Sequence, residues 1–249
     1  MKKEYINEVS WGKILAFLRN TMGIYVGEEK KCRNFVEAVH WMACAGTQWR
    51  RLESGYGNWN SIFKRFDAWS KKGIWEQLMQ FCIEDPDLEH VMLDATIVRA
   101  HACAAGYGEQ SVQGLGRSRG GFTCKISALV EALGLPLKFI ITPGQSSDVT
   151  QADALLADIR NTTVLADRGY DSDAVRMRLL QTNCIAVIPP RSNRINQYYY
   201  DKHIYRERHA IECFFSKIKH FRRVFSRYDK SARNYMAFLS FVGAIIWLR

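Results

Sequence analysis

The chain has 249 residues, enough for one large domain or two smaller domains that each bury a core. Hydrophobic residues make up 47% and charged residues 24%, as in an ordinary globular protein, and the seven cysteines contain no CxxC pair, which argues against a zinc ribbon or finger. The net charge of +10 indicates a polyanionic partner, with nucleic acid the first candidate.

The two ends of the chain carry no targeting or membrane signal that we recognise. The start, MKKEYINEVSWGKIL, is basic but lacks the long apolar stretch of a signal peptide. The apolar segment 237-AFLSFVGAIIWL-248 is shorter than the ~20 residues that span a bilayer, so we expect a buried helix or strand there. The odd number of cysteines suits a reducing compartment. We therefore expect a cytoplasmic protein that does not contact a membrane.

The first part of the chain, up to about Asp85, is predicted to be helical. In 34-NFVEAVHWMACAGT-47 the apolar residues recur with a helical period, and Asn34 is the expected N-cap. A short segment begins near Gln48. Further helices are predicted over 60–73 and over 74–84, the last ending before a proline.

The helix predicted over 60–73 has one apolar stripe and a basic remainder. Asn58 or Asn60 is its expected N-cap, and Lys64 and Arg65 lie off the stripe. A basic amphipathic helix in third place fits a helix-turn-helix-like DNA-binding domain, in which Lys64 and Arg65 would contact DNA. A plain helical bundle with a solvated basic face explains the same pattern equally well.

The second part of the chain reads as strands followed by an alternation of helices and strands. Strands are predicted at 91–100, 123–132, 136–143, 163–169 and 184–190. Helices are predicted at 150–160, 173–182 and about 203–223. Three strands joined by short turns indicate an antiparallel meander, and the later alternation indicates parallel additions. This order predicts an RNase H-like α/β domain with a mixed five-stranded sheet.

Two aspartates stand out because each lies in or directly after an apolar strand. Asp94 interrupts 91-VMLDATIVRA-100, where an ionised carboxylate is costly unless a charge meets it. Asp167 follows Val164–Ala166 at the expected end of a strand, where open α/β sheets form their ligand crevice. Other acids nearby are interpreted as helix N-caps or first-turn acids, namely Asp148, Asp171 and Asp173.

Glu212 is the third acid of interest and lies on the predicted late helix. At about 100° per residue, it shares one stripe with Tyr205, Arg208 and Lys219. A surface ion pair between Arg208 and Glu212 is the simple alternative. Three carboxylates that converge, however, are suitable ligands for Mg²⁺ ions ~4 Å apart, which clamp a phosphodiester during phosphoryl transfer. A metal site would also explain why Asp94 tolerates its apolar strand.

The stripe Tyr205, Arg208, Glu212 and Lys219 spells Y-x2-R-x3-E-x6-K, which resembles the signature of DDE transposases of bacterial insertion sequences. The segments 93-LDATIVRAH-101, 117-RSRGGFTCKISALVEALGLPLKFIITPGQSSD-148 and 165-LADRGYDSD-173 resemble the same family. So does the helical segment 49-WRRLESGYGNWNSIFKRFDAWSKKGIWEQL-78. The resemblance covers the whole second half of the chain.

The resemblance implies a DNA-binding helical domain over 1–88 and an RNase H-like DDE catalytic domain over 89–249. It implies that Asp94, Asp167 and Glu212 are catalytic and hold two Mg²⁺ ions, for which Mn²⁺ would substitute. Water would cut the DNA at each element end, and the freed 3′-OH would attack target DNA. Tyr205, Arg208 and Lys219 would contact DNA, and we expect the same of Arg117 and Arg119 in the Gly-rich loop 106–121.

The partners implied are the double-stranded DNA of the element ends and of the target. The chain would form a homodimer in the DNA complex. We expect the protein to be bacterial and associated with the nucleoid. Two other functions remain open. A DNA-binding regulator derived from a transposase would bind without cutting, although such a chain would be free to lose the three acids. A metal-dependent nuclease would hydrolyse DNA without joining it, and the acids alone do not exclude it.

Overall fold

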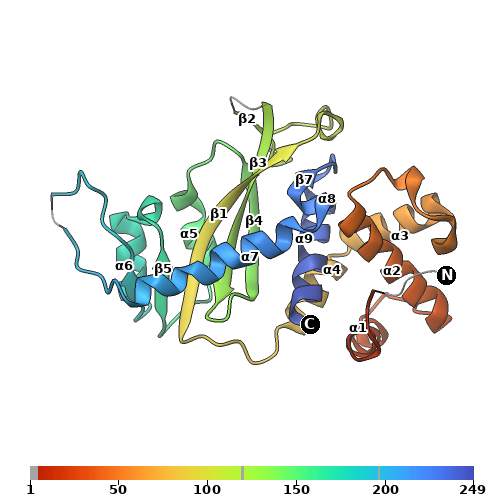
Figure 1. Ribbon diagram of the computed structural model, residues 1–249, viewed down its shortest axis with the longest axis horizontal. Helices are drawn as coiled ribbons and strands as arrows, with labels where there is room; N and C mark the ends of the chain where they lie inside the picture. The colour runs from red at the N-terminus through yellow and green to blue at the C-terminus, as the bar shows by residue number, and fades with distance from the viewer. Residues whose placement is uncertain (1–4, 119–120, 196) are drawn as a thin grey trace. The chain divides into compact units, whose positions relative to one another are not determined.

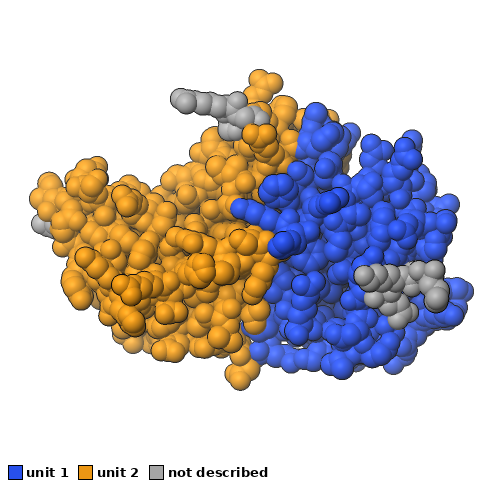
Figure 2. Space-filling view, viewed as in Figure 1, with its two compact units in different colours: residues 1–84, 101–104, 218–249 blue, residues 85–100, 105–217 orange. Residues whose placement is uncertain are grey.

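The computed structural model describes residues 5–118, 121–195 and 197–249. The chain divides into two compact units (Figure 2). The helical unit comprises residues 1–84, 101–104 and 218–249, and the sheet unit comprises residues 85–100 and 105–217. Over the described part of the chain, no helix is both long enough and apolar enough to cross a membrane.

The helical unit is built from the N-terminal helices and the last helix of the chain. Its longer helices are α1 (Glu8–Asn20), α2 (Glu29–Ala45), α3 (Trp59–Lys71), α4 (Ile74–Cys82) and α9 (Ala232–Trp247). Short elements join them, namely η1 (Trp49–Arg51), η2 (Ser54–Tyr56), α8 (Arg222–Phe225) and the two-residue strand β7 (Ser226–Arg227). The predicted all-α character of the N-terminal region is confirmed.

Asparagine side chains cap two helices of this unit, α1 and α3, and one predicted cap is not found. Asn58 caps α3, because its Oδ1 accepts from the backbone N–H of Asn60 at 2.9 Å. Asn34 is not an N-cap, since α2 begins five residues earlier at Glu29. The Asn34 amide instead donates to the Tyr56 carbonyl at 2.8 Å, so a tertiary contact uses the polar group that we assigned to a cap.

The C-terminal helix α9 belongs to the helical unit, which differs from the predicted division that placed all of 89–249 in one domain. Helix α9 is apolar on most of its circumference and therefore needs neighbours on several sides. It packs against α4. The rings of Phe66 and Phe238 stack at 4.4 Å, and those of Trp75 and Phe241 meet edge-on at 5.2 Å. The aromatic core of this unit thus joins sequence positions that are far apart.

The sheet unit is a mixed sheet. Its strands are β1 (His90–Ala100), β2 (Gly116–Ser118), β3 (Gly121–Glu131), β4 (Pro136–Pro143), β5 (Thr163–Ala166) and β6 (Ile185–Val187). The order is β2-β3-β1-β5-β6, with β4 also paired to β3. Strands β1, β3 and β4 are antiparallel neighbours, whereas β5 is parallel to β1 and β6 is parallel to β5. This connectivity confirms the RNase H-like fold and the five predicted strands, and it adds the short strand β2.

Helices lie on both faces of this sheet (Figure 1). The apolar residues Val91, Leu93 and Leu129 form a core with residues of α5 (Ala152–Leu155) and α6 (Asp173–Gln181). The helix α7 (His209–Lys219) crosses the strands in Figure 1, and its Phe214 ring stacks on Phe139 of β4 at 5.8 Å. Side chains alternate along β1, so successive residues face these two helical layers in turn.

Two helices of the second half are shorter than predicted. The helix expected over 150–160 is the 3₁₀ turn η4 (Asp148–Gln151) followed by the four-residue α5. The helix expected over 203–223 is the 3₁₀ segment η6 (Ile204–Arg208) followed by α7, which ends at Lys219. A 3₁₀ segment often begins or ends an α-helix. The predicted stripe therefore starts on a tighter helix than we assumed.

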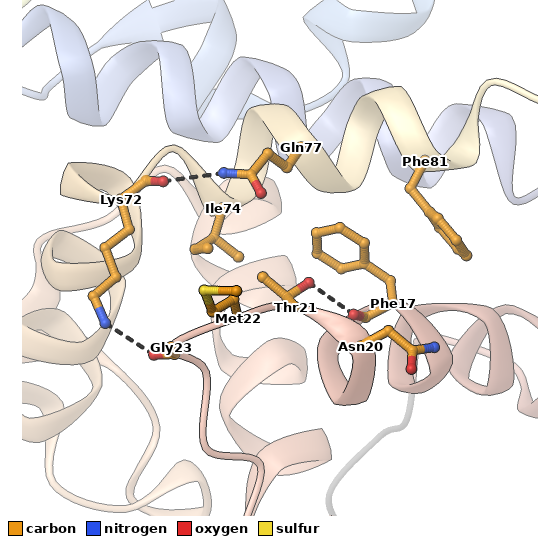
Figure 3. A pocket seen from close by; sticks show the side chains of 9 residues that line it. All are labelled: Phe17, Asn20, Thr21, Met22, Gly23, Lys72, Ile74, Gln77 and Phe81. Carbon is orange, nitrogen blue, oxygen red and sulfur yellow. Dashed lines mark hydrogen bonds between the residues drawn. The ribbon is translucent and has the colours of Figure 1, made fainter.

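A cavity of about 620 Å³ lies in the helical unit between the end of α1 and the start of α4 (Figure 3). Lys72 closes one side of it by donating from Nζ to the Gly23 carbonyl at 2.9 Å. The lining is mainly apolar and includes Phe17, Ile74 and Phe81. None of the described residues around it is acidic, so this cavity is unrelated to the predicted carboxylate site.

Candidate active site

Strand register brings the first two predicted acids together. Parallel pairing of β1 with β5 ends at Leu93 and Ala166, which are direct partners. Asp94 and Asp167 occupy the next position after this pair on each chain segment. Asp94 also pairs with Ala128 of β3 on its other side. The two aspartates therefore stand side by side where β5 ends, as the crevice rule for α/β sheets predicts.

The shifted pKa of Asp94 is consistent with its position beside Asp167. The side chain of Asp94 is 22% exposed. Burial raises the pKa of Asp94 above its ordinary value, and the negative charge of Asp167 raises it further. A backbone hydrogen bond from Ala95 to Asp94 Oδ1 at 2.7 Å and the charge of Arg208 act in the opposite direction. A carboxylate whose ionisation is disfavoured by a neighbouring carboxylate is suited to binding a cation beside it.

A tight turn fixes Asp167. Asp167 caps the 3₁₀ turn η5 (Arg168–Tyr170), and its Oδ1 accepts from the Gly169 backbone N–H at 2.8 Å. A Cβ atom at position 169 would lie only 2.8 Å from that same oxygen. Glycine at position 169 therefore leaves room for the carboxylate to fold back onto the turn.

Arg208 links Asp94 to the third predicted acid. Its Nη1 lies 2.7 Å from Asp94 Oδ2, and its Nη2 forms an ion pair with Glu212 Oε1. Burial alone would lower the pKa of Arg208, but the charge and hydrogen bond of Asp94, together with Tyr205 and Glu212, outweigh burial and raise it. The Glu212 side chain is 50% exposed. The simple i,i+4 ion pair is thus present, and it also includes an acid from a distant strand.

Tyr205 completes this group from η6. The Arg208 guanidinium lies 5.8 Å from the centre of the Tyr205 ring, and the Tyr200 ring meets Tyr205 edge-on at 5.5 Å. Burial raises the pKa of Tyr205, and the negative charge of Asp167 contributes to the increase. Tyr205, Arg208 and Glu212 therefore gather at the same end of the sheet as the two aspartates.

The donor set suits a hard divalent cation, but the acids do not stand in a ready-made metal cluster. Carboxylate oxygens are the ligands that Mg²⁺ prefers. Within residues 5–118, 121–195 and 197–249, however, no group of three His, Cys, Asp or Glu side chains is placed to hold a metal ion. The guanidinium of Arg208 instead joins Asp94 and Glu212. A cation shared by all three acids would have to replace Arg208.

Four other residues predicted to contact DNA are described, and they lie on β2, α3 and α7. Arg117 is exposed on β2, with its guanidinium 5.2 Å from the Phe122 ring centre. Arg119 lies outside the described residues. Lys64 is exposed on α3 in the helical unit. Lys219 is exposed at the end of α7 and groups with the helical unit.

Arg65 is less available than we expected. Its guanidinium lies 4.4 Å from the Phe35 ring centre and 4.9 Å from that of Trp69. Its Nη2 also donates to Cys32 Sγ at 3.4 Å. A side chain stacked between two aromatic residues contributes to the core of α2 and α3. An apolar residue four positions away on the same helix, Trp69, was the sequence signal for this packing.

Asp171 has a role that the sequence did not show. It is 2% exposed, and it accepts from Arg176 Nε at 2.7 Å, Arg194 Nε at 2.9 Å and the Arg191 backbone N–H at 2.8 Å. Our interpretation of Asp171 as a cap was wrong, because Ser172 caps α6. Asp173 is the first-turn acid, as predicted. Arg191 and Arg194 lie 20 and 23 residues away in sequence, so they give no local signal of this network.

Asp148 also does more than start a helix. It lies in the first turn of η4, as predicted, but its Oδ1 is 2.6 Å from Nζ of the buried Lys125. Lys125 also donates to the Ser146 carbonyl at 2.6 Å. A lysine within the apolar strand β3 was the available signal, because a buried ammonium needs a carboxylate partner.

An RNase H-like sheet with two adjacent aspartates and a glutamate on the crossing helix defines the DDE class of proteins. Residues 85–247 match the family described as "Transposase DDE domain", and residues 6–79 match the family "Putative transposase of IS4/5 family". The chain belongs to the DDE transposases of bacterial insertion sequences.

Two relatives are similar to parts of this chain. The "Putative transposase for insertion sequence element IS6501" of Brucella ovis is 41% identical over 132 residues, which are 51% of this chain and 99% of the relative. The "Uncharacterized protein y4sN" of Sinorhizobium fredii is 32% identical over 101 residues, which are 41% of this chain and 81% of that protein.

Solved structures give remote likenesses. A piggyBac transposase synaptic complex with hairpin DNA matches with a TM-score of 0.42 and 13% identity, over 75% of this chain and 48% of that chain. The Mos1 strand transfer complex matches with a TM-score of 0.36 and 10% identity, over 86% of this chain and 74% of that chain. The fold assignment therefore rests on the strand connectivity described above.

Proposed function

We propose that this transposase binds the terminal inverted repeats of its insertion sequence, cuts the DNA there and joins the ends to target DNA. Asp94, Asp167 and Glu212 are the catalytic residues and hold two divalent cations, Mg²⁺ or its substitute Mn²⁺. The observation that carries the proposal is the register of β1 and β5, which places Asp94 beside Asp167. Arg208 then connects this pair to Glu212.

The acids differ in how firmly the chain holds them. Asp167 is fixed by its turn and Asp94 by its strand, whereas Glu212 is half exposed on a helix. Bound cations would supply charge stabilisation for the attacking and leaving oxygens of the phosphodiester. The two aspartates form the rigid part of the cation site, and Glu212 joins them when Arg208 releases it.

Arg208 serves a second purpose once it leaves the acids. Its planar guanidinium matches a phosphate as well as a carboxylate. Arg208, Tyr205 and Lys219 contact the DNA phosphates near the cleaved bond, and Arg117 and Arg119 add contacts from the 106–121 segment. The phosphate charge would thus draw Arg208 from Asp94 at the moment when the acids need to be free.

The helical region 1–88 recognises the element ends, with Lys64 of α3 contacting the DNA and Arg65 stabilising that helix through its stacking on Phe35 and Trp69. The net charge of +10 supports this role. Catalysis resides in the RNase H-like region predicted over 89–249. Because two ends must be joined in one event, the active form is a homodimer on DNA. The protein acts in the bacterial cytoplasm, at the nucleoid.

The test is a strand-transfer assay with Mg²⁺, a duplex that ends in the inverted repeat flanking this gene, and a supercoiled target plasmid. Asp94→Asn, Asp167→Asn and Glu212→Gln should each abolish joining and leave end binding intact. Asp158→Asn is the matched control, because the Asp158 side chain is 90% exposed and pairs with Lys138 at 3.7 Å. Full joining by any of the three variants would remove that residue from the site.

The same assay separates two other functions. Nicking of the duplex by the wild-type protein without any joining would indicate a metal-dependent nuclease. Binding without nicking or joining would indicate a DNA-binding regulator that keeps an unused site. Omission of Mg²⁺ and its replacement by Mn²⁺ check the cation directly, because the reaction should stop without a divalent cation and resume with Mn²⁺.

A further inference from the structure

Tyr170 presents a buried hydroxyl with no partner. The residue is 1% exposed, and its phenolic oxygen makes no hydrogen bond to any described residue. Buried polar groups are hydrogen-bonded in the great majority of cases, because an unpaired one loses its water without compensation. A tyrosine kept in such a place needs a reason other than packing, since phenylalanine would fill the same space.

The environment of Tyr170 is the carboxylate site itself. The residue ends the turn η5 that Asp167 caps, and its backbone N–H donates to the Asp167 carbonyl at 3.0 Å. Its ring packs in the core that contains Leu93 and Ala166, which directly precede the two aspartates. Burial raises the pKa of Tyr170, and the negative charges of Asp148, Asp94 and Asp167 add to the increase. The charges of all three acids therefore act on this phenol.

These acids differ in whether a cationic side chain already pairs with them, and Asp167 has no such partner among the described residues. Asp148 is paired with Lys125 at 2.6 Å. Asp94 accepts from Ala95 on Oδ1 and from Arg208 on Oδ2. Asp167 accepts from Gly169 on Oδ1, and no described residue donates to its Oδ2. Asp167 is thus the acceptor that matches the unpaired Tyr170 donor.

We propose that Tyr170 is a positioning residue for the cation site, through a hydrogen bond from its hydroxyl to the Asp167 carboxylate when a divalent cation is held there. The inference rests on the proposed function. Carboxylates that bind metals are themselves oriented by hydrogen bonds from neighbouring residues. The Gly169 N–H holds one oxygen of Asp167, and Tyr170 holds the carboxylate from the other side. Two fixed contacts define which way the carboxylate faces.

The experiment measures Mn²⁺ binding to the full chain by titration calorimetry and by the electron paramagnetic resonance of free Mn²⁺. Thermal unfolding is followed in parallel without metal. Tyr170→Phe should weaken Mn²⁺ binding about tenfold or more, as loss of such a contact does elsewhere. The midpoint temperature of its thermal unfolding without metal should equal or exceed that of the wild type, because the lost hydroxyl has no hydrogen-bond partner.

Tyr235→Phe is the matched control from the helical unit. The Tyr235 hydroxyl is also buried, but it donates to the Val224 carbonyl at 2.7 Å. This variant should lower the metal-free unfolding midpoint and leave the Mn²⁺ affinity unchanged. The two variants therefore have opposite signatures, which a general effect of removing a buried hydroxyl would not produce.

The outcomes separate this inference from the proposed function. Wild-type binding of Mn²⁺ that Asp167→Asn abolishes supports the cation site. Equal affinity of Tyr170→Phe and wild type would then overturn the positioning role alone. A lower metal-free midpoint for Tyr170→Phe would also overturn it, because the hydroxyl would have a structural partner. Wild-type protein that does not bind Mn²⁺ would overturn the cation site and, with it, the role of Tyr170.

Discussion

Arg208 Nη1 lies 2.7 Å from Asp94 Oδ2, although the two residues are 114 positions apart in sequence. The same guanidinium pairs with Glu212 one helical turn away. An arginine thus neutralises two of the three acids that we assign to the cation site. These ion pairs should weaken cation binding, because a cation and Arg208 compete for the same carboxylate oxygens.

Replacement of Arg208 by glutamine should tighten Mn²⁺ binding at pH 7.5. Removal of a competing charge-assisted interaction of about 1–2 kcal/mol corresponds to roughly a 5- to 30-fold lower Kd. Strand transfer should fall in the same variant, because a phosphate contact is lost. Titration calorimetry with Arg206→Gln, an exposed neighbour on η6, provides the control. An unchanged Kd in Arg208→Gln would show that the ion pair does not limit cation binding.

Asp171→Asn should destabilise the sheet unit by about 3 kcal/mol at pH 7, because it leaves Arg176 and Arg194 without their buried carboxylate. Urea unfolding measures this difference. Asp173→Asn is the control, since the Asp173 side chain is 83% exposed and its ion pair should contribute at most about 1 kcal/mol. Equal losses in the two variants would contradict the central role of Asp171.

The pH dependence gives a second check on Asp171. Burial alone would raise the pKa of Asp171, but donation by the Arg191 N–H, Arg176 and Arg194 outweighs burial and lowers it. A depressed carboxyl pKa contributes stability above the unfolded value of about 3.9, and this contribution is lost as the pH falls through the folded pKa. The gap between wild type and Asp171→Asn should therefore narrow below about pH 4.

His40 should make the helical unit sensitive to acid. Burial, and to a lesser extent the charge of Arg249, lowers the pKa of His40 from 6.5 to about 4. Between these values the unfolded chain binds the extra proton, so stability falls as the pH decreases from 6.5 to 4. The difference corresponds to about 3 kcal/mol. Denaturant unfolding at several pH values would measure it.

His40→Phe should remove most of this slope, because phenylalanine does not titrate and the surrounding rings of Tyr5, Phe221 and Phe241 favour an aromatic replacement. The same replacement at the exposed His220 should leave the slope as it is in the wild type. A slope that persists in His40→Phe would assign the acid sensitivity to another group.

Lys64 and Arg65 should respond differently to mutation, although they are neighbours on α3. Lys64→Glu should weaken binding of the element end and reduce the salt slope of the binding constant by about one. Arg65→Ala should instead lower stability by about 1 kcal/mol, because its stacking on Phe35 and Trp69 is lost. Fluorescence anisotropy over a salt series, with thermal unfolding alongside, distinguishes the two effects. A larger loss of DNA affinity in Arg65→Ala would reverse this assignment.

Local patterns in the sequence were sufficient for most elements and for the acids. The apolar runs around Asp94 and Asp167 predicted buried strands, and the register of β1 and β5 confirms that these strands are neighbours. The asparagine before α3 predicted its start, and the stripe from Tyr205 to Lys219 identified the family. Each of these signals lies within about a dozen neighbouring residues, which is the range over which periodicity and capping act.

Tertiary packing decided what no local pattern encodes. The ion pair of Arg208 with Asp94, the ion pair of Arg194 with Asp171 and the placement of α9 with the N-terminal helices all join positions far apart in sequence. The partner of each carboxylate depends on how whole helices and strands pack to bury their apolar faces. This packing is decided by many residues together. The sequence by itself was enough to propose the three acids, whereas the fold determined that an arginine pairs with two of them and that a tyrosine is buried in the adjoining core.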